Sequence, residues 1–199
     1  MVDAVAPEQR RITIQAIAAS AVVTAALWFA LLRFLPAPTN AEPLPTALAC
    51  CAIAALLTLV LGVEAIAHER LVTAAIDPLA GVETRRMRVN FRYLSNTVEQ
   101  FIVFAGGLLA LAAYVSPRLL VIFTIVWVLM RWAFWIGYHR SPLLRGLGAP
   151  GMIQSMIVLF YVAYRFGSDS YGAAAGIGVI VLFLLVEAFL FWWVKRPSQ

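Results

Sequence analysis

The chain has 199 residues, of which 63% are apolar and 13% are charged, and its formal net charge is +5. Soluble domains carry about 45 to 50% apolar and about 25% charged residues, so this composition, with a mean hydropathy of +0.89, excludes a soluble globular protein. No segment is both polar and long enough to form a separate soluble domain. We therefore expect an all-α integral membrane protein that folds as a single bundle.

Six apolar stretches approach the roughly 20 residues that a helix needs to cross a bilayer. In chain order they are 12–35, 44–67, 96–115, 119–138, 147–164 and 173–194. The fifth is the least regular, because Gly148, Pro150 and Gly151 fall in its first turn. If that stretch did not span the membrane, the C-terminus would change sides.

Basic residues predict the orientation of the six spans. Under this count one side of the membrane receives Arg10, Arg11, Arg70, Arg85, Arg86, Arg88, Arg140, Arg145, Lys195 and Arg196, and the other receives Arg33, Arg118 and Arg165. The positive-inside rule then places both termini in the cytoplasm, and we expect a bacterial inner (plasma) membrane. The arginines are spread over separate loops, a pattern that argues against nucleic-acid binding.

Cysteine and histidine form no pattern typical of a metal site. Cys50 and Cys51 are adjacent within the second span, where they are expected to pack. His68 and His139 lie in different predicted loops, the first of which is the long segment 68–95. We therefore expect no metal.

Polar side chains follow one face of each of two neighbouring helices. The third predicted helix carries Arg92, Asn96 and Glu99 at positions i, i+4 and i+7, and the fourth carries Arg131 and Tyr138 at i and i+7. A short turn joins the two helices, so they should be antiparallel neighbours. The head of one and the tail of the other should then meet at the same, cytoplasmic, face.

Two interpretations of this polar cluster are open. In the first, Glu99 and Arg131 neutralise one another as a buried ion pair, and Asn96 bridges the helices. In the second, the excess of positive charge and hydrogen-bond donors binds an anionic, carboxylate-bearing or thiolate ligand. The residues left over by the ion pair, which favour the second interpretation, are Arg92, Tyr138, Arg140 and Arg145.

The two polar helices resemble the signature helices of the MAPEG family, the membrane-associated proteins in eicosanoid and glutathione metabolism. The resemblance rests on R-x3-N-x2-E within 92–100, on R-x6-Y-x-R-S-x3-R within 131–145, and on the preceding loop with Glu69-Arg70. It implies a four-helix domain over 44–167. Residues 1–43 would add an N-terminal transmembrane helix and connector, and residues 168–199 a C-terminal transmembrane helix.

The resemblance implies a homotrimer that holds glutathione between neighbouring subunits near the cytoplasmic face. Carried over by position, the residues that bind glutathione would be Arg92, Asn96, Glu99, Arg131 and Tyr138. Arg145 would be the catalytic residue near the sulfur, because an arginine that is always charged favours the nucleophilic thiolate.

Two positions depart from the family pattern. Gln100 stands where leukotriene-synthase-like members have a tyrosine, and Phe134 replaces a second ring that carries a hydroxyl or imidazole in several members. Two polar contacts to glutathione would therefore be missing. The family also includes members that bind lipid without catalysis, so fold alone does not establish an enzyme.

The leading functional hypothesis is a glutathione-dependent membrane transferase or peroxidase that acts on a hydrophobic electrophile. The alternative is a non-catalytic lipid-binding or scaffolding protein of the same fold. A transporter is a third hypothesis, but the chain shows neither the internal repeats nor the broken helices of that class.

Small residues predict close packing by the two additional helices. Ala16, Ser20 and Thr24 form a stripe on the first predicted helix, and Gly172 and Gly176 form one on the sixth. We expect these helices to clasp each other around the core or to extend the wall of the site. The sequence assigns no role to the intramembrane acids Glu64 and Glu187.

Overall fold

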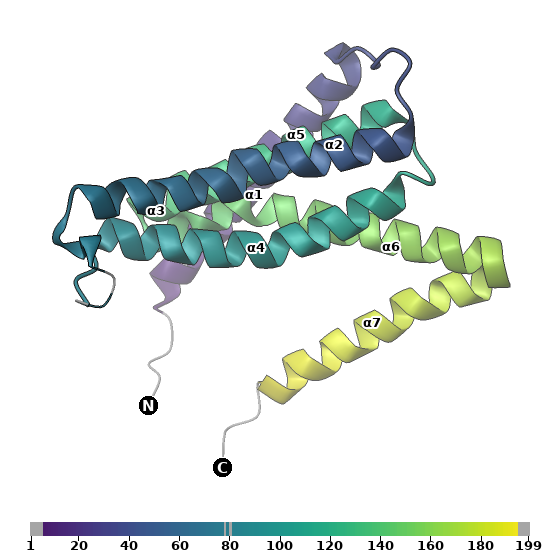
Figure 1. Cartoon of the computed structure of the whole chain (residues 1–199). Helices are drawn as coiled ribbons and strands as arrows, with labels where there is room; N and C mark the ends of the chain where they lie inside the picture. Colours follow the sequence, from purple (N-terminus) through teal and green to yellow (C-terminus); the bar gives the residue numbers. More distant parts are fainter. Residues whose placement is uncertain (1–5, 78, 80, 195–199) are drawn as a thin grey trace. The chain divides into compact units, whose positions relative to one another are not determined.

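The protein is described by a computed structural model covering residues 6–77, 79 and 81–194, in which every regular element is helical (Figure 1). Six helical segments of this range are long and apolar enough to cross a membrane, which confirms the predicted all-α membrane fold with six spans. The segments are Pro7–Phe34, Pro43–Leu71, Arg85–Leu111, Pro117–Arg140, Pro142–Tyr171 and Ala173–Val194. Lys195 and Arg196 lie outside the described residues.

In the part of the chain that the structure describes, ten helical elements make up these spans and their connections. They are α1 (Pro7–Phe34), α2 (Pro43–Ala55), η1 (Leu56–Val60), α3 (Leu61–Leu71), η2 (Ala74–Ile76), α4 (Arg85–Leu111), α5 (Pro117–Arg140), η3 (Pro142–Gly148), α6 (Ala149–Tyr171) and α7 (Ala173–Val194). The chain divides into two compact units, one extending to Ser155 and the other beginning at Met156.

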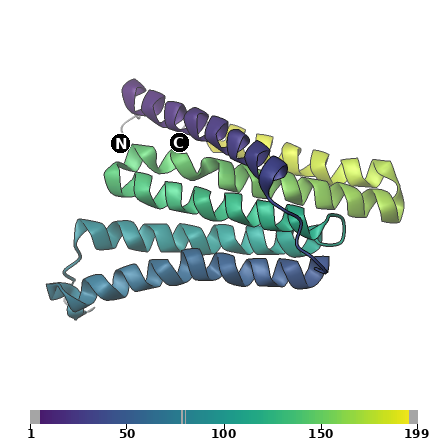
Figure 2. The same cartoon turned by 90° about the horizontal axis from the view of Figure 1, so that it is seen from above.

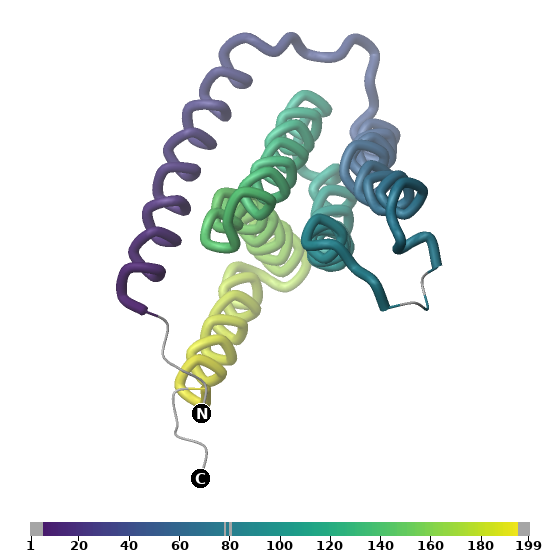
Figure 3. The backbone as a smooth tube through the Cα atoms, turned by 90° about the vertical axis from the view of Figure 1, so that its left-hand side faces the viewer, coloured from purple at the N-terminus to yellow at the C-terminus, as the bar shows by residue number. Residues whose placement is uncertain are grey.

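Proline marks the start of several helices. It occupies the first or second position of α1, α2, α5 and η3, where a missing backbone N–H costs no helical hydrogen bond. The connector 35–42, which leads away from α1 (Figure 3), contains two further prolines, Pro36 and Pro38. Because this connector interrupts the helix, α1 and α2 are separate helices that both contact α5.

Helix α4 is longer than hydropathy predicted. It begins at Arg85 instead of residue 96, and α3 runs on to Leu71, so the predicted loop 68–95 shrinks to 72–84. Thr84 caps α4, since its Oγ1 accepts a hydrogen bond from the N–H of Met87 at 3.0 Å. The polar first turns of α4 lower its mean hydropathy without preventing a helix, because one face still buries Met87 and Tyr93.

A π-helical segment, η1, joins α2 to α3, and the three together run alongside α4 (Figure 2). Such a segment disturbs the regular backbone hydrogen bonds of a helix. Two side chains from neighbouring helices bond to its carbonyls: Trp132 Nε1 donates to Leu57 O at 2.8 Å and Tyr93 Oη donates to Thr58 O at 3.2 Å. The irregularity therefore ties the second span to α4 and α5.

The predicted stripe on α1 packs against α5. Ala16, Ser20 and Thr24 are the buried residues of α1, and Thr24 Oγ1 lies 3.0 Å from Met130 Sδ on α5. Met130 belongs to an apolar cluster of α5 that is covered by four α1 side chains: Leu27, Trp28, Leu31 and, just beyond the helix, Leu35.

A polar bridge also connects α1 to the core. Trp28 Nε1 donates to Gln154 Oε1 at 3.0 Å, and Gln154 Nε2 donates to Phe123 O at 2.9 Å. Gln154 is buried at the start of α6, so its amide satisfies partners on two helices that are far apart in sequence. The N-terminal helix is thus an integral part of the first unit.

In the second unit, α7 turns back along the second part of α6. The turn is Gly172, whose φ of 90° suits glycine, so this residue belongs to the connection and not to the predicted stripe. Gly176 does face α6: the backbones of Gly167 and Gly176 approach so closely that a Cβ at either position would collide with the other helix. Phe160 and Phe183 add an edge-to-face contact at 5.1 Å.

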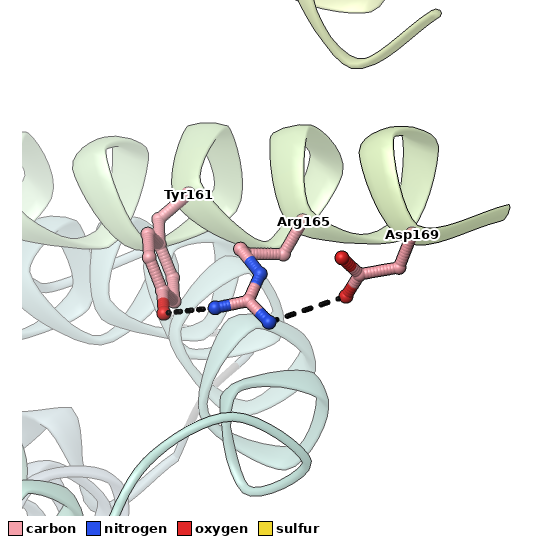
Figure 4. A network of polar contacts seen from close by, with 3 residues as sticks. All are labelled: Tyr161, Arg165 and Asp169. Carbon is pink, nitrogen blue, oxygen red and sulfur yellow. Dashed lines mark hydrogen bonds and ion pairs between the residues drawn. The ribbon is translucent and has the colours of Figure 1, made fainter. Parts of the chain in front are cut away.

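One face of α6 carries a short polar network near its C-terminal end (Figure 4). Arg165 lies between Tyr161 and Asp169, donating to Tyr161 Oη at 3.4 Å and pairing with Asp169 at 3.3 Å. The spacing of four residues on each side is the one that brings helical side chains together. This arginine is one of the three that were predicted to lie away from the cytoplasm.

Six spans require both termini to lie on the same side of the membrane, and the arginine distribution predicts the cytoplasmic side. Reporter fusions placed after Gln199 and within the connector 36–43 are expected to report opposite sides, with the connector outside. Fusions that report the same side would contradict six spans, and reversed signals would contradict the orientation.

Candidate functional site

A cavity of about 370 Å³ lies where α4 begins and α5 ends. All six residues singled out from the sequence line it, and so do five others. The complete lining is Arg92, Ser95, Asn96, Glu99 and Gln100 from α4, Arg131, Phe134 and Tyr138 from α5, Arg145 and Gly148 from η3, and Ala149 from α6. The antiparallel pairing of α4 and α5 therefore brings the two polar faces together as the short connection between them predicted.

Arg131 is fully buried at the base of this site, with 0% of its surface exposed. Its guanidinium donates to three neutral oxygens of α4: Nη1 to Gln100 Oε1 at 2.7 Å, and Nη2 to Asn96 Oδ1 at 3.0 Å and to Thr97 Oγ1 at 2.9 Å. Its Nε has no hydrogen-bond partner among the described residues. The positive charge is thus held in place without being neutralised.

The buried ion pair considered from the sequence does not form. Within the described part of the chain, Glu99 makes no salt bridge with Arg131, because the amides of Asn96 and Gln100 occupy the positions around the guanidinium. Glu99 instead lies exposed on the cavity wall. The bridging role expected for Asn96 is present, since its side chain connects α4 to α5.

The two departures from the family pattern both support Arg131. Gln100 accepts the shortest of its hydrogen bonds. The Phe134 ring lies under the guanidinium, with its centroid 4.4 Å from Cζ, as in a cation–π contact. Both side chains therefore fix the position of the arginine.

Close backbone approaches hold η3, and with it Arg145, against the end of α5. A Cβ added at Gly137 would collide with the carbonyl of Leu144, and one at Gly148 would collide with Phe134. Ser141 begins the segment, its Oγ accepting from the Leu143 N–H at 3.3 Å. Arg145 is exposed on this turn and faces the cavity as part of its lining.

The charge of the cavity favours an anion. Three arginines and one glutamate line it, so it carries a surplus of positive charge, while Asn96 and Tyr138 add neutral polar groups. Guanidinium groups bind carboxylates with paired hydrogen bonds. Arg140, which the sequence grouped with these arginines, is exposed at the end of α5 and is absent from the lining.

Three residues of the site carried too weak a signal to be named from the sequence. Thr97 and Ser95 are ordinary in a membrane helix, and Ala149 has no polar group. Thr97 could have been found only from its place beside Asn96, on the side that turns toward α5. Among residues 6–77, 79 and 81–194, no three His, Cys, Asp or Glu side chains gather as a metal site requires.

Comparison with known proteins gives one finding. A sequence model described as the MAPEG family matches residues 47–167, which is more than half of the chain and contains the whole cavity lining. No curated protein and no solved structure matches the chain.

Proposed function

Because the chain belongs to the MAPEG family, we propose that it is a membrane enzyme that uses glutathione as a transferase or peroxidase. The observation that carries the proposal is the buried, un-neutralised Arg131 at the base of a cavity with a surplus of positive charge. Glutathione has two carboxylates and a thiol that ionises, so its charge complements that surplus. One ammonium group of the peptide remains, and Glu99 is the acid that could receive it.

Each polar group of the cavity has a role in this proposal. Arg92 binds a carboxylate of glutathione and the buried charge of Arg131 attracts the other from beneath Asn96 and Gln100, while Glu99 binds the amino group and Asn96 and Tyr138 bond to the peptide groups. The hydrogen bonds from Arg131 to α4 orient the guanidinium before the ligand arrives, which reduces the entropy lost on binding. The cytoplasmic placement of the site follows the predicted orientation.

Arg145 acts on the sulfur. Glutathione's thiol is mostly protonated at neutral pH, and a nearby guanidinium stabilises the thiolate, which is the nucleophile. In conjugation the thiolate forms a C–S bond with an electrophilic carbon, and the leaving group departs with its electron pair. In peroxide reduction the thiolate attacks the terminal oxygen of a hydroperoxide and the O–O bond breaks, which gives glutathione sulfenic acid and an alkoxide that takes up a proton to become an alcohol. The thiol of a second glutathione then attacks the sulfenic sulfur, which forms the disulfide and releases water.

We further propose a homotrimer with the cavity at a subunit boundary, and a hydrophobic substrate that arrives from the bilayer. The observed lining comes only from α4, α5, η3 and α6, so α2 and α3 contribute nothing to it. A neighbouring copy could complete the open side. Native mass spectrometry in detergent tests the assembly, and a stable monomer that still binds glutathione would contradict it.

The test of the proposed function is glutathione binding by the purified protein, measured by calorimetry in detergent. We expect wild type to bind, and Glu99→Gln to bind about tenfold or more weakly, since charged hydrogen bonds contribute on the order of 1.5 to 3 kcal/mol. Glu64→Gln is the matched control: this acid is exposed on α3, lies 3.4 Å from His68 and is outside the cavity.

Two results would count against glutathione. Wild type that does not bind the peptide would favour the alternative, a non-catalytic lipid-binding or scaffolding protein. Equal losses in Glu99→Gln and Glu64→Gln would show that binding does not depend on this cavity.

A further inference from the structure

A second cavity, of about 700 Å³, shares no lining residue with the first. It lies where α3 ends, α4 begins and α5 ends, and its lining is Ala65, His68, Glu69, Val72, Thr73, Arg86, Asn90, Trp135 and His139. The volume is within the range of cavities that hold small molecules. None of these residues has a part in the proposed glutathione chemistry.

Glu69 is the buried acid of this cavity, with 8% of its surface exposed. Its Oε1 accepts a hydrogen bond from Thr84, the residue that caps α4. Its Oε2 is buried and has no partner among the described residues. A carboxylate oxygen in this condition lacks an N–H or O–H donor, and a ligand with an ammonium group would supply one.

The other polar groups of the cavity leave it electrically balanced. Arg86 is the one arginine of the lining and Glu69 the one acid. Asn90 is held by two neighbours, its Oδ1 lying 2.9 Å from Trp135 Nε1, which donates to it, and 2.8 Å from His139 Nε2. A balanced pair of opposite charges suits a zwitterion, whereas the surplus in the first cavity suits an anion.

The location of the cavity favours a lipid headgroup over a soluble zwitterion as its ligand. Its residues occupy the final turns of one span and the two positions after it, the first turns of the next span and the final turns of a third. This is the level of lipid headgroups when the spans cross a bilayer. Val72 on the cavity wall and its neighbour Leu71 are strongly exposed apolar side chains. They offer a surface for the start of acyl chains.

We propose that this cavity binds the headgroup of phosphatidylethanolamine. The ammonium group donates to Glu69 Oε2 and the phosphate accepts from Arg86, so both charges of the headgroup are paired. The chemistry distinguishes this lipid from its relatives. Phosphatidylcholine carries a fully methylated ammonium without an N–H donor, and phosphatidylglycerol carries no ammonium to meet the acid.

The test is lipid retention by the full-length protein, purified in detergent and then given equal amounts of phosphatidylethanolamine, phosphatidylcholine and phosphatidylglycerol. Native mass spectrometry counts the lipid bound to each protein. We expect about a tenfold preference for phosphatidylethanolamine, which Glu69→Gln removes because a neutral amide no longer attracts the ammonium. Arg86→Ala should weaken retention of all three lipids, and Arg88→Ala, a neighbouring arginine outside the lining, should leave it unchanged.

The preference for phosphatidylethanolamine is measured on the wild-type protein alone, so it still tests the proposal if Glu69→Gln fails to fold. Equal retention of phosphatidylethanolamine and phosphatidylcholine would overturn the proposal. It would also be overturned if soluble glycerophosphoethanolamine bound as tightly as the lipid, since the ligand would then be a soluble zwitterion. Glutathione binding, measured on the same samples, reports separately on the first cavity.

Discussion

Replacing Arg131 with methionine is expected to lower both the stability of the protein and its affinity for glutathione. The side chain is fully buried, and its loss removes the guanidinium donor from oxygens of Thr97 and Gln100 and leaves Asn96 Oδ1 with only the long hydrogen bond from Gln100 Nε2 at 3.4 Å. Unsatisfied buried groups of this kind cost on the order of 1 to 3 kcal/mol each before the side chains rearrange. We expect a net loss of about 2 to 4 kcal/mol, measured as unfolding in mixed micelles, and binding weakened about tenfold or more.

Arg131→Lys separates the two effects, because lysine keeps the charge but cannot reach three oxygens in the fixed geometry of a guanidinium. It should retain more stability than methionine and still bind glutathione poorly. Arg33→Met, at the exposed end of α1, should change neither property. Variants of Arg131 that are less stable yet bind glutathione with full affinity would limit this arginine to a structural role.

Arg145→Ala is expected to reduce turnover much more than affinity. If the guanidinium acts mainly on the thiolate, its loss leaves the peptide bound but makes the thiol harder to ionise, and an interaction felt chiefly in the reaction lowers the rate more than binding. Conjugation of an aryl halide should slow by at least tenfold while the dissociation constant of glutathione changes by less than about threefold.

Thiolate absorbance against pH measures the same effect directly on wild type and variant. Arg140→Ala is the matched control, since this arginine is the last residue of α5 and lies outside the cavity lining. The proposed enzymatic role is wrong if the thiol bound to wild type ionises at no lower pH than the thiol of free glutathione and the protein turns over neither aryl halides nor lipid hydroperoxides. Equal losses of rate in the Arg140 and Arg145 variants would argue for a general effect of surface charge.

The spans and the polar face of α4 could be predicted from sequence because each depends on a regular period. A helix crossing hydrocarbon must be apolar over about 20 residues, and the i, i+4, i+7 spacing of Arg92, Asn96 and Glu99 places them on one face whatever the neighbours are. The turn of few residues between α4 and α5 then determines which ends meet. These regularities were sufficient to bring Arg92, Asn96, Glu99, Arg131 and Tyr138 to one cavity, whereas Arg145, which lies in η3 beyond α5, was expected there from the family resemblance.

The partners of Arg131 could not be predicted in the same way. Opposite charges suggested Glu99, but the choice among Glu99, Gln100 and Thr97 depends on the rotation of α4 about its axis, which several packing contacts decide together. One of them is the stacking of Tyr93 on Trp135, with centroids 4.5 Å apart. The exposed position of Glu99 follows from that rotation.

The early start of α4 was missed for a different reason. A hydropathy window measures suitability for hydrocarbon, and the first turns of α4 lie beside the loop, where arginines are tolerated. The cap at Thr84 was the available signal, because a threonine followed by Met87 and Tyr93 on one face is typical of a helix start. Hydropathy and helicity are separate properties at the ends of membrane helices.

The packing of α1 on α5 has a consequence for the proposed approach of a hydrophobic substrate from the bilayer. The apolar ridge of Ile122, Val126 and Met130 is sealed by protein, and α1 also covers Gly146, next to Arg145, through Ile17. Under the proposed function, a hydrophobic substrate therefore cannot reach Arg145 along this face of α5. Such a substrate must approach from another face of the bundle, because the N-terminal helix α1 blocks this one.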